Sequence, residues 1–209
     1  MTLTLATVLA LAHQCASGIA AEALVPQLRV ESQFNELAIG INHGPSVQAS
    51  TVEEATAIAT RYIRAGYSVD LGIAQINSHN LARLNMTVAQ AFDACTSLRA
   101  AETVLTENYA VASQSYSGLE AISRTWSYYN SGSAERGMVN GYVRKVWAAA
   151  NELLPLIRAG SETGSPNTQI ALQGQLGAGE ASASRSSVPQ QQKQSFVYGT
   201  TDAGVVVFK

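Results

Sequence analysis

Apolar side chains recur with a helical period along most of the chain. Between residues 21 and 32 they stand at positions i, i+3, i+4 and i+7, the spacing of one face of an amphipathic helix, at Ala21, Leu24, Val25 and Leu28. Stretches 97–112, 117–130 and 139–154 carry comparable stripes. No segment before residue 158 shows the apolar and polar alternation of a convincing strand. The pattern therefore predicts an all-α domain.

Capping residues mark where several of these helices should begin and end. Thr51 stands three residues before Glu54, an arrangement that predicts the start of a further helix reaching to about residue 65. Ser117 with Glu120 predicts a second capping box of the same kind. Gly132 follows the third stripe and predicts the end of that helix.

Two prolines and one irregular segment interrupt the regular pattern. Pro26 lies inside the first stripe, so that helix should either begin near Pro26 or kink there. Pro155 is expected to close the last stripe. Residues 68–80 have neither a helical nor a strand period, which predicts a tight turn followed by a short helical segment that Asp70 could cap.

A short apolar run, residues 3–11, opens the sequence. It is shorter than the roughly 20 apolar residues that span a bilayer, so no stable membrane span is predicted. The first basic side chain is Arg29, so the run lacks the charged start of a secretory signal, although residues 10–12 resemble a small-residue cleavage site. A packed first helix and a degenerate or truncated signal both remain open.

Composition separates the end of the chain from the rest. From residue 159 to residue 209, Gly, Ser, Gln and Pro account for 23 of 51 residues, and both tryptophans lie upstream. Such a segment offers too little apolar surface to offset its ordering entropy. The sequence therefore predicts one globular domain over residues 1–157 and a flexible tail over residues 158–209.

Charge and metal-ligand content exclude two classes of partner. Thirteen Lys and Arg against 15 Asp and Glu give a net charge of −2, so there is no basic field to hold nucleic acid. Two cysteines allow one bridge and cannot build a four-thiolate zinc site, and the three histidines lack the spacing of a metal motif. No metal and no organic cofactor are predicted.

Four short motifs stand in a fixed order: Glu31-Ser32, the Gly-Ile-Ala-Gln-Ile-Asn run from Gly72 to Asn77, Tyr128-Tyr129-Asn130, and Tyr142. Together they resemble the lysozyme-like lytic transglycosylases, which cut the glycan strands of bacterial peptidoglycan. The resemblance covers about residues 15–155 and implies a goose-type lysozyme-like helical fold with a cleft between helices. Tyr128 departs from the family pattern, which usually has a small residue there.

The resemblance implies a role for each matching residue. Glu31 would act first as acid and then as base, with the substrate's N-acetyl group and 6-hydroxyl in place of a second carboxylate and water. Because Glu31 lies on an apolar stripe, desolvation should raise its pKa, as a general acid requires. Substrate-binding roles fall to Ser32, Gln75, Asn77, Tyr129, Asn130 and Tyr142, of which Tyr142 could also donate a hydrogen bond to Glu31. Packing roles for the two tyrosines stay equally open.

Further sequence features resemble the branch of the family that is associated with type IV secretion and conjugation systems. They include Phe92-Asp93-Ala94-Cys95 and a cysteine, Cys15, sixteen residues before Glu31. The branch implies action in the periplasm or cell envelope, a Cys15–Cys95 disulfide, and secretion-apparatus proteins as partners of the tail. Two buried free thiols are the alternative for the cysteines.

Two other functions remain open from the residues. Asp70 could activate water from the opposite face of the glycosidic bond, which would make the protein a lysozyme-type hydrolase. The protein could instead serve mainly as an assembly factor of the apparatus, with residual sugar binding and with partners docked on the tail.

Overall fold

The computed structural model describes residues 1–163 as a mainly helical domain. Its α-helices are α1 (Leu5–Cys15), α2 (Ala21–Ser32), α3 (Val52–Arg64), α4 (Ala94–Ala112), α5 (Gly118–Ser131), α6 (Arg136–Val139) and α7 (Tyr142–Thr163). Two short 3-10 helices are η1 (Ser78–Asn80) and η2 (Ala89–Phe92). The helical class predicted from the sequence is confirmed. The predicted tail lies, from residue 164 onward, outside the described residues.

A small antiparallel sheet, absent from the sequence prediction, follows α2. Its strands are β1 (Ile39–Ile41), β2 (Val69–Leu71) and β3 (Ile76–Asn77), paired in the order β1-β2-β3. The expectation of no strand before residue 158 is therefore wrong, because strands of two or three residues are too short to show a period of two. Asp70 lies within β2 and caps no helix, whereas Asn77 caps η1 by accepting a hydrogen bond from the His79 backbone N–H at 3.0 Å.

The three predicted helix boundaries are confirmed, but only one of the two predicted capping boxes forms. The Thr51 hydroxyl accepts from the Glu54 backbone N–H at 3.2 Å, as a capping box requires. Gly132 ends α5 with a φ of +66°, which glycine adopts without strain. The Ser117 capping box is wrong: its side chain makes no capping bond, and Glu120 instead pairs with Arg124 at 3.0 Å.

Neither proline breaks its helix. α2 begins at Ala21, five residues before Pro26, and α7 continues through Pro155 to Thr163. The expectation that Pro155 closes the last helix is therefore wrong. A proline removes one backbone hydrogen bond of a helix, but α2 and α7 pack along each other, and Leu153 and Ile157 are buried on both sides of Pro155. This tertiary packing offsets the local cost.

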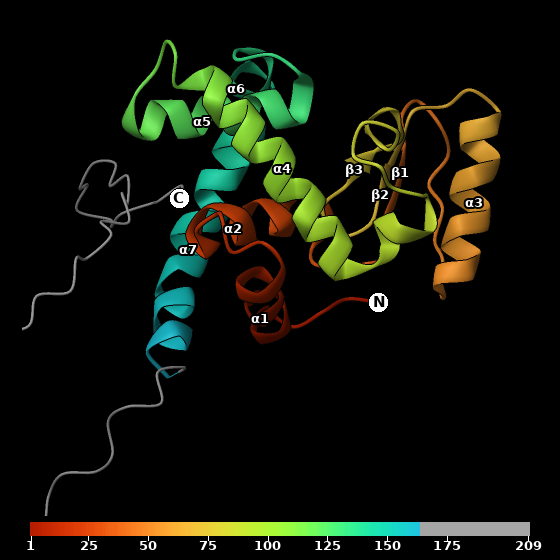
Figure 1. Cartoon of the computed structure of the whole chain (residues 1–209), viewed down its shortest axis with the longest axis horizontal. Coiled ribbons are helices and arrows are strands. Elements are labelled where there is room, and N and C mark those ends of the chain that lie inside the picture. The colour runs from red at the N-terminus through yellow and green to blue at the C-terminus, as the bar shows by residue number, and fades with distance from the viewer. Residues whose placement is uncertain (164–209) are drawn as a thin grey trace, which may run out of the picture.

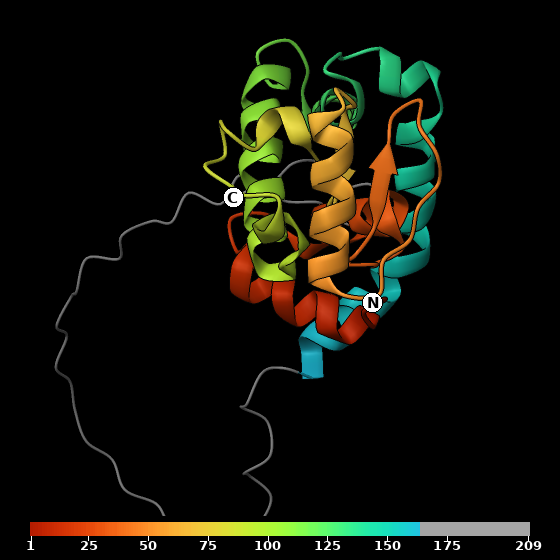
Figure 2. The ribbon, with the colours of Figure 1, turned by 90° about the vertical axis from the view of Figure 1, so that its right-hand side faces the viewer.

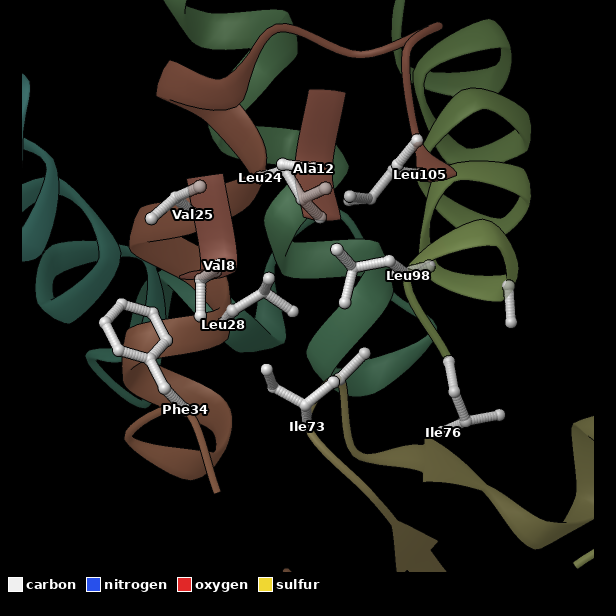
Figure 3. Close-up of a cluster of buried hydrophobic side chains, with 14 of the residues drawn as sticks. Val8, Ala12, Leu24, Val25, Leu28, Phe34, Ile73, Ile76, Leu98 and Leu105 are labelled. Atoms are coloured by element: carbon white, nitrogen blue, oxygen red, sulfur yellow. The ribbon is translucent and has the colours of Figure 1, made fainter. Parts of the chain in front are cut away.

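The main hydrophobic core gathers side chains from α1, α2, α4 and the turn between β2 and β3. Figure 3 shows Val8, Leu24, Leu28, Ile73 and Leu98 converging there, and each is at most 1% exposed. The apolar run at the start of the sequence is thus a packed helix in this structure.

The predicted disulfide is present. Cys15 at the end of α1 is bonded to Cys95 in the first turn of α4, with the two Cα atoms 5.4 Å apart. The bridge closes a segment of 80 residues that contains α2, α3 and the whole sheet. The alternative of two free thiols is therefore wrong.

The elements form a larger helical part and a smaller part made of α3 and the sheet. In Figure 1, α4 runs from the sheet side of the molecule to α5 and α6, and α3 lies on the far side of the sheet from the other long helices. Figure 2, in which α3 faces the viewer, shows the helices of the larger part behind it. None of the helices in residues 1–163 combines the length and apolar character needed to cross a bilayer.

Candidate active site

Glu31 lies near the end of α2, next to the turn between β2 and β3. The helix ends because Gln33 takes a left-handed conformation, with a φ of 55°. The Ser32 hydroxyl donates to the Ile73 backbone carbonyl at 2.7 Å, which ties the last turn of α2 to the hairpin turn. Glu31 is thereby carried on a fixed backbone with the apolar core on one side of it.

The Glu31 carboxyl is partly buried and is held by Tyr142, the first residue of α7. The Tyr142 hydroxyl donates a hydrogen bond to Glu31 Oε1, which confirms the contact predicted between the two residues. Burial raises the pKa of Glu31 to about 7, a rise that the charge of Asp70 reinforces and that the hydrogen bonds from Tyr142 and Gln27 partly oppose. Glu31 can therefore hold a proton near neutral pH.

A cleft of about 300 Å³ opens in front of Glu31. It is lined by Glu31, Asn42, Asp70, Gln75, Ile76, Asn77, Asn80, Val104, Tyr129 and Asn130. Five predicted site residues, from α2, the β2–β3 hairpin and the end of α5, thus meet at one cleft: Glu31, Gln75, Asn77, Tyr129 and Asn130. Tyr142 contacts Glu31 and is buried, whereas Ser32 is not among the lining residues.

The hairpin turn that faces the cleft has a strained but well-bonded backbone. Gly72 has a φ of +71°, and a Cβ at this position would overlap the Ala91 carbonyl oxygen, so only glycine fits. Gln75 has a φ of +50°, and its amide nitrogen donates to the Gly72 carbonyl at 2.9 Å. The Tyr129 hydroxyl donates to the Ala74 carbonyl at 2.8 Å. Gln75 and Tyr129 therefore fix the turn as well as lining the cleft.

Asp70 is held on the cleft wall by two amides. Asn77 donates to Asp70 Oδ1 at 2.7 Å, and Asn42 donates to Asp70 Oδ2 at 3.0 Å. Burial raises the pKa of Asp70, and these hydrogen bonds partly oppose that rise. Both Asn77 amide atoms are engaged, because the nitrogen also donates to Ser68 at 2.7 Å and the oxygen caps η1. Asn77 thus lines the cleft and also holds Asp70, Ser68 and the start of η1 in place.

Asn42 is a site residue that the sequence analysis missed. It directly follows β1, and its backbone N–H donates to the Ser68 carbonyl at 3.0 Å, so the strand pairing carries it to Asp70. No motif includes Asn42, and only a correct prediction of the short sheet would have found it.

A second, larger groove adjoins the cleft at Asn42 and Asn130. Asn130 is exposed at the end of α5, and its amide oxygen accepts from Asn140 at 2.9 Å. The groove, of about 780 Å³, shares Asn42 and Asn130 with the first cleft and adds His43 and Arg136 among others. An extended ligand could therefore pass from one depression to the other.

Apart from its two carboxyls, the narrow cleft offers amides and a tyrosine rather than metal ligands. In the part of the chain that the structure describes, no three His, Cys, Asp or Glu side chains gather closely enough to hold a metal ion. Burial raises the pKa of Tyr129 well above its ordinary value, so this side chain stays neutral. The arrangement can deliver a proton from Glu31 to a neutral ligand oriented by hydrogen bonds.

Replacing Tyr142 with Phe should raise the pKa of Glu31 above about 7. The change keeps the buried ring but removes the hydroxyl that stabilises the carboxylate, so the protonated form gains in relative stability. Carbon-13 NMR titration of the Glu31 carboxyl measures the shift directly. Tyr116→Phe, which removes a hydroxyl near Glu135 outside the cleft, is the control and should leave the Glu31 titration unchanged. An unchanged titration in Tyr142→Phe would contradict the bonding described.

Comparison with known proteins agrees with the motifs. The family model described as Transglycosylase SLT domain matches residues 9–150. "Protein virB1" of Rhizobium radiobacter is 38% identical over 147 residues, which cover 70% of this chain and 62% of that protein. "Type IV secretion system protein virB1" of Brucella suis biovar 1 is 35% identical over 164 residues, which cover 72% of this chain and 69% of that protein. This chain thus covers less than two thirds of the Rhizobium relative. No solved structure matches significantly.

Proposed function

The chain belongs to the transglycosylase SLT domain family, and we propose that it is a peptidoglycan lytic transglycosylase. It cleaves the β-1,4 bond between N-acetylmuramic acid and N-acetylglucosamine and leaves a 1,6-anhydromuramic acid end. One observation carries the proposal: Glu31 has its pKa raised to about 7 at the wall of a cleft otherwise lined mostly by amides and a tyrosine. Neutral hydrogen-bonding groups suit a glycan better than an ionic ligand.

The reaction proceeds in two steps at Glu31. Protonated Glu31 first gives its proton to the glycosidic oxygen, and the bond from that oxygen to the anomeric carbon breaks as the N-acetyl carbonyl oxygen attacks that carbon. The Glu31 carboxylate then takes the proton of the sugar's own 6-hydroxyl, whose oxygen displaces the N-acetyl oxygen. Glu31 ends protonated and no water is consumed. The Tyr142 hydroxyl stabilises the carboxylate formed between the two steps.

The other residues orient the glycan or support those that do. Asn130 presents its amide nitrogen and Gln75 its amide oxygen to the acetamido substituents, because the other atom of each amide already bonds within the protein, and Tyr129 presents its ring at the cleft wall. Ser32 and Asn77, predicted as substrate ligands, act in this proposal mainly by fixing the end of α2 and the wall around Asp70. No metal or organic cofactor takes part.

A lysozyme-type hydrolase is the second candidate, because Asp70 lines the same cleft as Glu31. In that mechanism Asp70 would remove a proton from an attacking water. The structure favours transglycosylation, since each Asp70 oxygen already accepts an amide hydrogen bond and is directed toward Asn42 or Asn77.

The names of the relatives and the disulfide support a proposal for the cellular setting. Both relatives carry the name virB1, and the Brucella protein is named as a type IV secretion system protein. The Cys15–Cys95 bridge suits an oxidising compartment. In this proposal the protein acts in the periplasm, where it opens the wall locally for a type IV secretion or conjugation apparatus, and the segment after residue 163 docks apparatus proteins.

A mainly non-catalytic assembly role is tested by comparing two changes in cells. If the enzyme activity matters, Glu31→Gln should reduce DNA transfer or secretion. If Glu31→Gln retains transfer while deletion of residues 164–209 abolishes it, the protein is an assembly factor. Immunoblots of the envelope fraction control for the amount of each variant.

Lysis of purified peptidoglycan should slow as the pH rises through about 7. The first step needs protonated Glu31, whose pKa is about 7, so each further pH unit should lower the rate about tenfold. Turbidity measured between pH 5 and pH 9 gives the profile. A rate that continues to rise up to pH 9 would contradict Glu31 as the general acid.

A further inference from the structure

Gln27 is an unusual side chain for its position in the core. It lies four residues before Glu31 on α2, so the two side chains share one face of the helix. It is 1% exposed, although it carries a full amide. Within residues 1–159, the other buried polar side chains are serines and threonines, namely Ser97, Ser123, Thr125 and Ser127. Burying an amide costs free energy unless its polar atoms form hydrogen bonds.

Those hydrogen bonds go to the two groups at the centre of the site. The Gln27 side chain bonds to the Glu31 carboxyl and also to the Tyr142 hydroxyl. In both cases it favours the charged form of its partner, as an N–H donor does, and it thereby opposes the effect of burial. Glu31, Tyr142 and Gln27 therefore form a closed set in which each member contacts the other two.

The amide oxygen of Gln27 indicates that this side chain is not there simply to fill the core. Gln27 Oε1 is buried and has no hydrogen-bond partner among the described residues. A buried polar atom without a partner destabilises the fold, and a leucine or methionine would fill the same space without that loss. Gln27 thus contributes more to the site than to the stability of the core.

We propose that Gln27 is a positioning residue, which holds the Glu31 carboxyl and the Tyr142 hydroxyl in place and stabilises the carboxylate left after Glu31 gives up its proton. The inference rests on the proposed function, because only there does Glu31 alternate between acid and base. Gln27 is buried and does not line the cleft, so it acts on the reaction through Glu31 and Tyr142 and not by contact with the substrate. Its effect is to keep Glu31 acidic enough to donate in the first step despite its burial.

The experiment is a carbon-13 NMR titration of the Glu31 carboxyl, with peptidoglycan lysis measured in parallel. Gln27→Met keeps the length and removes the amide, so the Glu31 midpoint should rise by about half a pH unit or more. The maximal rate should fall about tenfold, while the melting temperature stays equal or rises. The titratable groups that face Glu31 in the described structure, Asp70, Tyr129 and Tyr142, are unchanged in this variant.

A matched control and a second variant complete the test. Thr125→Val also removes a buried polar group, one that bonds only within its own helix, to the Ala121 carbonyl at 2.8 Å, and it should leave the Glu31 midpoint unchanged. Gln27→Leu also removes the amide without adding a charge and should also raise the midpoint, so it serves if Gln27→Met fails to fold. A Glu31 midpoint unchanged in the folded variant overturns the proposal. The titration needs no substrate, so a wild-type protein that fails to cut peptidoglycan would contradict the proposed function separately.

Discussion

Replacing Glu31 with Gln is expected to lower the rate of peptidoglycan lysis by at least about 10³-fold. Glu31 supplies the proton of the first step and accepts the proton of the second, and glutamine can do neither. Glutamine has nearly the same shape and its amide oxygen can still accept the Tyr142 hydrogen bond, so the cleft should persist. Zymography and turbidity measurements on purified peptidoglycan give the rates.

The matched control changes a glutamate that is far from the chemistry. Glu107 is exposed on α4 and pairs with Arg83 outside the cleft, so Glu107→Gln should keep the wild-type rate within about twofold. Circular dichroism and melting curves establish that both variants are folded. Residual lysis by Glu31→Gln above a tenth of the wild-type rate would show that another group is the acid.

Removing the disulfide by Cys15→Ala together with Cys95→Ala is expected to lower the free energy of unfolding by about 4 kcal/mol. The bridge closes an 80-residue segment, so its loss returns considerable freedom to the unfolded chain. Urea unfolding at pH 7 measures the difference. Because neither cysteine lines the cleft, the rate per folded molecule should not change.

Reduction supplies an independent control for the disulfide prediction. Wild-type protein unfolded in the presence of dithiothreitol should lose the same free energy as the double variant, and dithiothreitol should not affect the variant. A difference of less than 1 kcal/mol between oxidised wild type and the double variant would mean that the bridge adds little to the stability of the domain.

The long helices could be predicted because their apolar stripes and caps are local features. The apolar stripe extends along α2, and the cap at Thr51 marks the start of α3 at Val52. The short strands could not, because their register depends on pairing between residues some 30 positions apart, such as Gly40 with Asp70. The sequence predicts a helix end at Pro155, but α7 continues through it because packing against α2 outweighs the tendency of proline to end a helix.

The site, too, was predictable only in part. The contact of Tyr142 with Glu31 was expected from the family resemblance, which supplies the residue types and their order. The resemblance does not say which side chains also make contacts within the protein, as Ser32 does with Ile73 and Asn77 does with Ser68. Gln27 could not be singled out from the sequence, because the role of one polar residue among apolar ones depends on which side chains it contacts in the fold.

The central claim, cleavage without water, is tested most directly by mass spectrometry of the ends that the wild-type protein forms on purified peptidoglycan. The proposed mechanism predicts 1,6-anhydromuramic acid ends, which are lighter than reducing ends by one water molecule and take up no oxygen-18 from labelled water. Reducing ends that carry oxygen-18 from the labelled water would contradict it and would assign the attack to water, with Asp70 as the candidate base.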